Sequence, residues 1–184
     1  MSRDPGAPSD RIAAAQRGEA WALREIWQQL SPKVQGYLTG RGVVDAEDLT
    51  SEVFIQVFER LPKFRGDEAA LRTFVFSVAH ARYVDHLRRT SRRGTTVEFD
   101  PAVHDGTADS AESGALRVIS DQRVRAALEA LSEDQRNVLL LRVVADLDLV
   151  QIAEALGKSV GAIKSLQHRA LATLRPIFES AVSP

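Results

Sequence analysis

Apolar residues recur at intervals of three and four along most of the chain, which is the spacing of one face of an α-helix. In residues 45–60, for example, this face consists of Leu49, Val53 and Val57. No stretch alternates apolar and polar residues as a half-buried strand does. The pattern therefore predicts an all-α protein.

Serine, proline and glycine residues divide this pattern into separate helices. Ser31 and Pro32 have the order of a cap followed by proline at the first helical position, which predicts a helix that begins there and ends by Gly40. Ser132 and Gln135 have the spacing of a capping box and predict another start. The predicted helices are 12–16, 19–30, 32–40, 45–60, 68–91, 112–131 and 133–144, followed by a pair near the C-terminus.

Residues 94–111 interrupt the helical period with Gly, Thr, Ser, Pro and Asp. Such a composition is typical of flexible connections. We therefore expect two small helical domains, 10–93 and 112–184, joined by a flexible acidic linker. Residues 1–9 are expected to be a disordered tail.

Residues 150–169 have the pattern of a helix-turn-helix. Ile152 and Ala153 belong to a first helix, Gly157 can adopt the left-handed conformation that ends it, and Ser159 can cap the second helix. With Ile163 on the buried side, a step of about 100° per residue places four polar residues on the far side: Lys164, Ser165, His168 and Arg169.

Lysine and arginine can bind phosphates or guanine edges, and serine and histidine can bond to either. A packed helical hairpin with a solvated outer face is the alternative explanation. The small residue Ala153, the glycine turn at Gly157 and the basic face of the second helix occur together, and this combination favours DNA binding.

Charge is segregated along the chain although the net charge is only −1. This balance argues against a protein that coats nucleic acid indiscriminately. Asp48, Glu52 and Gln56 form a stripe opposite the apolar face of helix 45–60, and like charges at this spacing do not stabilise a helix. The stripe is either a solvated face or a docking surface for a basic partner. Separate acidic and basic patches suggest separate partners.

The helix over 68–91 is apolar on two sides, so it is either central in its domain or uses its second side for another purpose. Phe76 and Tyr83 lie on that second side, and arginines follow up to Arg93. Aromatic and cationic residues together bind single-stranded bases. Core packing is the commoner use of such aromatic residues, and both interpretations stay open.

Composition excludes several further classes of protein. The 184 residues are 44% hydrophobic, enough for a core, and contain no cysteine, which excludes disulfides and thiolate metal sites. No apolar run approaches the ~20 residues of a membrane span, and the polar beginning does not resemble a signal peptide. We expect a cytoplasmic protein without membrane insertion.

Two stretches together resemble the bacterial RNA polymerase sigma factors of the extracytoplasmic-function (ECF) group. The first is Asp45 to Phe54 with the following Phe64-Arg65-Gly66-Asp67, and the second runs from Leu131 to Arg169. The resemblance covers all of the chain except its ends and the details of the linker. It implies an initiation factor that binds core polymerase, through the beta-prime coiled coil and the beta subunit, and promoter DNA.

The resemblance also implies roles for individual residues. The core-docking residues would be Asp48, Glu52 and Gln56. The minus-ten element would be bound by Phe64, Arg65, Gly66, Asp67, His80, Arg88 and Arg89. The minus-thirty-five element would be read by Ser159, Lys164, Ser165, His168 and Arg169. Family members are often held inactive by an anti-sigma factor, so such a partner is an expectation, and the free protein is expected to be a monomer.

Three residues depart from the usual family pattern. Phe74 stands where tryptophan is common, Ala81 where asparagine often occurs, and Leu166 where arginine is frequent. Promoter preference therefore cannot be transferred from better-known members.

A helix-turn-helix repressor or activator that acts without polymerase is the second hypothesis, and it predicts tight binding to a two-fold palindrome. The acidic stripe and the near-neutral charge argue against it. An enzyme has little support: there is no His-Glu-x-x-His motif or phosphate-binding glycine loop, and the four histidines lack ligand spacing. We therefore expect no catalytic residues, no metal and no cofactor.

Overall fold

The computed structural model describes residues 8–92 and 122–179. Within these two ranges the elements are helices and no strand occurs, so the all-α prediction is confirmed. The predicted linker over 94–111 and the predicted helix start at 112 lie outside the described residues. Most of the predicted tail does as well, although the first helix already begins at Pro8.

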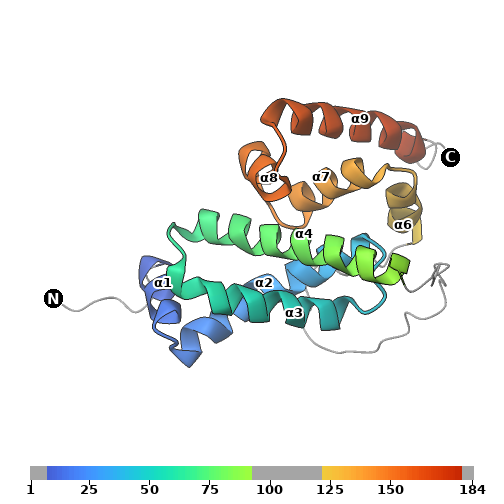
Figure 1. The fold of residues 1–184 in the computed structure, drawn as a ribbon. Helices are drawn as coiled ribbons and strands as arrows, with labels where there is room; N and C mark the ends of the chain where they lie inside the picture. Colours follow the sequence, from blue (N-terminus) through green and yellow to red (C-terminus); the bar gives the residue numbers. More distant parts are fainter. Residues whose placement is uncertain (1–7, 93–121, 180–184) are drawn as a thin grey trace.

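The N-terminal group contains α1 (Pro8–Gln16), α2 (Ala20–Gly40), α3 (Ala46–Arg60), the short 3-10 helix η1 (Leu61–Lys63) and α4 (Glu68–Arg92). Helix α3 packs on both α2 and α4, which also contact each other, and α1 lies across one end of these helices (Figure 1). The periodicity correctly identified the inner face of α3, because Leu49, Val53 and Val57 are buried. This arrangement brings α1 next to η1 and the loop that follows it.

The predicted break at Ser31 and Pro32 is wrong, because α2 continues through Pro32 to Gly40. A proline inside a helix removes one backbone hydrogen bond and costs about 3 kcal/mol. Ile26, Leu30 and Val34 stay on one buried side across this position. Burial of three large side chains outweighs the loss of one bond, since each contributes roughly 1.5–3 kcal/mol.

The C-terminal group contains α6 (Gln122–Glu129), α7 (Glu133–Val143), α8 (Leu149–Leu156) and α9 (Val160–Glu179). The predicted helix-turn-helix is α8 and α9, and Gly157 between them has a left-handed φ of 62°. The capping box at Ser132 is confirmed. A second one, which the sequence analysis missed, begins α8: Asp148 accepts from the amides of Val150 and Gln151.

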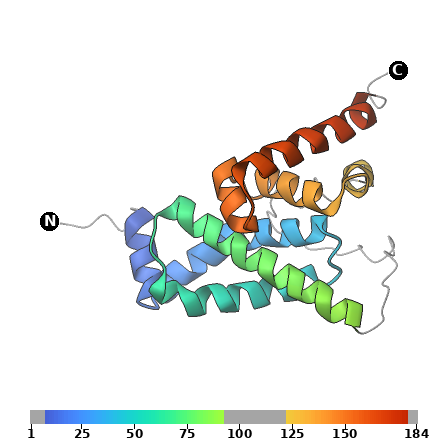
Figure 2. The ribbon, with the colours of Figure 1, turned by 45° about the horizontal axis from the view of Figure 1, so that its top comes forward.

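The two groups share one continuous apolar core. Helix α8 packs along α4, and α7 contacts α2, so α7 and α8 lie between the N-terminal group and α9 (Figures 1 and 2). This position explains the two apolar sides of α4. One side packs on α3, and the C-terminal group covers another. Gly40 makes the approach possible, because a Cβ there would lie 2.7 Å from Cδ2 of Leu140.

Candidate nucleic-acid interface

The outer face of α9 is polar and open to solvent. Ile163 is 0% exposed and anchors the opposite face, while Lys164, Ser165, His168 and Arg169 are all exposed. Helix α9 also lies on the side of its group that faces away from α4 (Figure 2). The helical periodicity therefore placed these four side chains on the correct side of the helix.

Two other residues of this motif have structural roles. The Ser159 hydroxyl accepts from the amide of Ala162 at 3.2 Å, so it caps α9, as its residue type indicated. Leu166 is buried in the core. The departure from the family pattern at Leu166 therefore lies inside the domain and not on the exposed face of α9.

The loop between η1 and α4 has a defined conformation. Phe64 is half-buried, with its ring 5.5 Å from that of Phe74, measured between centroids. Gly66 has a φ of 150°, and a Cβ there would lie 2.6 Å from Cβ of Ala70, so the turn requires glycine. The Asp67 carboxylate accepts from the amide of Ala70 at 2.9 Å and so caps α4.

His80, a predicted minus-ten residue, lies where the two groups meet. Its Nδ1 is 3.1 Å from the hydroxyl of Tyr37, and that hydroxyl donates to Oδ1 of Asn137 at 2.9 Å. Burial lowers the pKa of His80, and the nearby Arg41 guanidinium lowers it further. Beside it is a pocket of about 510 Å³ between the groups, lined by His80, Val84, Ser132, Glu133, Asp134, Asn137, Leu156 and Lys158.

We expect the free energy of unfolding to fall as the pH drops below about 6.5, the ordinary pKa of histidine. The folded pKa of His80 is lower, so the unfolded chain binds more protons just below that pH, and protonation favours unfolding. The contribution of neutral His80 to the free energy of unfolding is fully present above pH 6.5 and is lost as the pH falls toward the folded pKa. The groups that share this environment are Tyr37, Arg41, Glu133, Asp134 and Lys158.

Urea titrations at pH 7.5 and 5.5 test this expectation. The variant His80→Gln should lose part of the pH dependence, whereas His168→Gln, at an exposed position, should keep it. An identical pH dependence in the wild type and both variants would show that His80 does not cause it.

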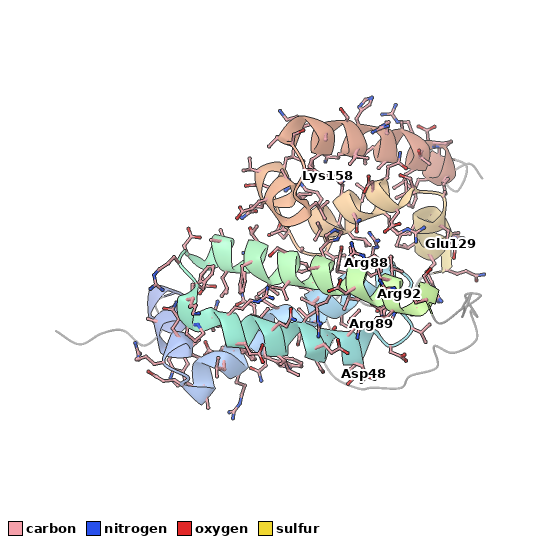
Figure 3. The ribbon with its side chains drawn as sticks, in the orientation of Figure 1. Asp48, Arg88, Arg89, Arg92, Glu129 and Lys158 are labelled. Carbon is pink, nitrogen blue, oxygen red and sulfur yellow. The ribbon has the colours of Figure 1, made fainter. Side chains whose placement is uncertain are left out.

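The acidic stripe on α3 is partly occupied by ion pairs within the chain. Asp48 is exposed and has no ion-pair partner among residues 8–92 and 122–179. Glu52, in contrast, has its Oε2 3.0 Å from Nη2 of Arg82 and 3.5 Å from Nη2 of Arg89, both on α4. Figure 3 labels Asp48 on α3 and Arg89 on α4. The acidic and basic patches, expected to be separate, therefore meet at Glu52.

The remaining core-docking and minus-ten residues, Gln56, Arg88 and Arg65, are at least partly open to solvent. Gln56 is half-buried, and Ile55 beside it is 60% exposed. Arg88 is exposed and 3.5 Å from the carboxylate of Asp85, one turn earlier on α4. Arg65 is exposed as well, and its guanidinium donates to the carbonyl of Phe64.

Sequence reasoning missed the polar contacts between the two groups. The Arg41 side chain is 1% exposed, is 2.7 Å from the Glu133 carboxylate and lies 3.9 Å above the ring of Tyr83. Asn137 is buried as well and bonds to Tyr37. An asparagine at the head of the apolar run 138–141 was the available signal, since buried amides usually have partners.

No three histidine, aspartate or glutamate side chains among the described residues are grouped closely enough to hold a metal ion. None of the helices in the described ranges combines the length and the apolar character of a membrane span.

Comparison with known proteins identifies the two groups. Residues 26–93 match the model of Sigma-70 region 2, and residues 121–174 match that of Sigma-70 region 4. The ECF RNA polymerase sigma factor BldN of Streptomyces coelicolor is 30% identical over 180 residues, which cover 94% of this chain and 68% of BldN. SigD of Mycobacterium tuberculosis is 32% identical over 171 residues, 89% of this chain and 80% of SigD.

Solved structures share the fold. CnrH, in complex with the cytosolic domain of CnrY, has a TM-score of 0.66 at 20% identity, over 96% of this chain and 99% of CnrH. RpoE, in complex with the anti-sigma factor NepR from Bartonella quintana, also has a TM-score of 0.66 at 20% identity, over 85% of this chain and 96% of the RpoE chain. The region 2 and region 4 matches together with the curated relatives show that this chain belongs to the ECF RNA polymerase sigma factors.

Proposed function

We propose that this protein directs core RNA polymerase to a specific set of promoters, in the cytoplasm and without chemistry of its own. The observation that carries the proposal is the presence, in one chain, of an exposed acidic position on α3 and an exposed basic face on α9. A repressor needs the second of these faces but not the first. An initiation factor needs both, because it must bind polymerase and DNA at once.

The minus-thirty-five element is proposed to bind the outer face of α9. Lys164 and Arg169 can reach phosphates or guanine edges, and Ser165 and His168 can bond to either of these groups. Ser159 supports this face by capping the helix. Its position at the N-terminus of α9 also leaves it close to any phosphate that the helix end attracts.

The variants Lys164→Ala and Arg169→Ala are each expected to weaken binding of the holoenzyme to the minus-thirty-five element by about 1–3 kcal/mol if these side chains read bases. Gel-shift titrations with a duplex that carries this element measure the effect. Arg24→Ala, which removes an exposed arginine from α2, is the control and should bind as the wild type does. Unchanged affinity in both α9 variants would remove the assignment.

The minus-ten element is proposed to bind the loop 64–67 and the basic end of α4. Phe64, Arg65, Gly66 and Asp67 form the loop, and Arg88 and Arg89 are exposed on α4. His80 is half-buried and lines the pocket between the two groups, with its Nδ1 3.1 Å from the hydroxyl of Tyr37. A role for His80 in promoter binding therefore requires the DNA to enter this pocket or the two groups to separate.

Core polymerase is proposed to bind the exposed side of α3 through Asp48, Glu52 and Gln56, with Ile55 adding apolar contact. The beta-prime coiled coil is the expected partner of this surface, and the beta subunit the expected partner of the C-terminal group. An anti-sigma protein is a further proposed partner, since the related RpoE was crystallised with one.

The test is a pull-down of the purified chain with bacterial core RNA polymerase, followed by run-off transcription on a promoter library. Association with core together with selective transcripts is the expected result and identifies both promoter elements. Tight binding to a palindromic duplex, without any association with core, would support the repressor hypothesis instead.

A further inference from the structure

Helix α1 lies outside the part of the chain that matches Sigma-70 region 2, which begins at residue 26. It is nevertheless built into the N-terminal group. Ile12, Ala14 and Ala15 are buried in the shared core, and α1 packs on η1 as well as on α2 and α4. Packing of these apolar residues explains why α1 is held in place. It does not explain what its polar residues do.

The polar residues of α1 bond to both ends of the segment that carries the loop 64–67. The side-chain amide of Gln16 donates to the carbonyl of Leu61 at 3.1 Å and to that of Phe64 at 2.8 Å. At the other end of α1, the Arg11 guanidinium makes two hydrogen bonds to the carboxylate of Glu68, the first residue of α4. Helix α1 therefore fixes where the chain enters and leaves this loop.

The backbone of the loop has few other restraints at its entrance. One further bond within the main chain joins the amide of Phe64 to the carbonyl of Leu61. The carbonyl of Phe64 otherwise accepts from Arg65, an exposed side chain that water can replace. Gln16 binds two carbonyls that are three residues apart, so it holds η1 closed and sets the direction in which Phe64 leaves it.

We propose that Gln16 is a positioning residue for the capture of the minus-ten DNA strand, with Arg11 in support. The inference rests on the proposed function of the loop 64–67. A loop held in its binding conformation loses less conformational entropy when the strand binds, so its affinity is higher. Gln16 touches the loop and not the DNA, and it acts by keeping Phe64 in place.

The test uses holoenzyme assembled from core polymerase and the full-length chain. The probe is a fluorescent single-stranded oligonucleotide with the minus-ten sequence found in the run-off library. Gln16→Met keeps the length of the side chain but removes the donor, and it should weaken strand binding about five- to tenfold. Gln28→Met, at an exposed position on α2, is the matched control and should bind normally.

Two further measurements separate positioning from general destabilisation. Gln16→Met should leave core affinity and binding to a minus-thirty-five duplex unchanged. Gln16→Lys restores a donor to the two carbonyls and should recover most of the strand affinity. A parallel loss of strand, duplex and core binding would mean that Gln16 supports the fold only, and would overturn the inference.

Failure of this inference can be told apart from failure of the proposed function. Selective strand binding by the wild type that Gln16→Met leaves unchanged would overturn the inference alone. A wild-type holoenzyme that does not select the minus-ten strand would overturn the proposed role of the loop, and the inference with it. If Gln16→Met does not fold, the comparison of Gln16→Lys with Gln16→Glu, which has acceptors only, gives the same two outcomes.

Discussion

The double variant Asp48→Arg and Glu52→Arg is expected to lose core polymerase binding entirely while it keeps its helical circular dichroism. Two reversed charges on one exposed stripe replace attraction to a basic partner by repulsion, and like-charge contacts across an interface cost several kcal/mol. At position 52 the new arginine would also face Arg82 and Arg89. Co-purification with core polymerase measures the effect.

The ion pairs of Glu52 determine which controls are needed. Asp48→Arg alone removes a charge that has no ion-pair partner within the described ranges, so its effect reports on docking and not on the contact between α3 and α4. Glu25→Arg reverses an exposed charge on α2 and should bind core as the wild type does. A double variant that still co-purifies with core polymerase would contradict the docking role of the stripe.

The variant Gly40→Leu is expected to weaken the packing between the two groups of helices. A Cβ at this position would already lie 2.7 Å from Cδ2 and 3.0 Å from Cδ1 of Leu140, and a leucine adds three further carbons. Overpacking of this kind costs about 1–3 kcal/mol. Urea titrations should show a lower midpoint of unfolding than that of the wild type.

Gly161→Leu is the matched control for this experiment. A Cβ at Gly161 would have no neighbouring atom within 4 Å, so the larger side chain should not lower the midpoint of unfolding. If Gly40→Leu unfolds at the same urea concentration as the wild type, the side chain of Leu140 makes room for the added volume. The close approach at Gly40 would then not limit the distance between the two groups.

The helical pattern and the outer face of α9 could be predicted because both depend on local periodicity. Ile163 and Ala170 repeat at the spacing of one helical face, and both are buried. The turn at Gly157 was equally local, since only one backbone conformation suits that position and glycine adopts it at low cost. These features need no knowledge of residues elsewhere in the chain.

The contacts that join distant segments could not be predicted from spacing. Glu52 and Arg82 are thirty residues apart and meet only because α3 packs on α4. For the same reason Ser31 and Pro32 looked like a helix start, since local chemistry does not show that the surrounding core holds α2 together. Tertiary packing decided both outcomes, and Asn137, beside the apolar run 138–141, was a local indication of a buried polar contact.

The hydrogen bond between Tyr37 and Asn137 joins residues that are 100 positions apart. Closure of so long a loop costs about 4 kcal/mol in chain entropy before the contact contributes anything. The N-terminal group is synthesised before Asn137, and domains generally fold as units in that order. The side of α4 that later packs on α8 must therefore be exposed to water in the nascent chain, so docking of the C-terminal group is the last step of folding.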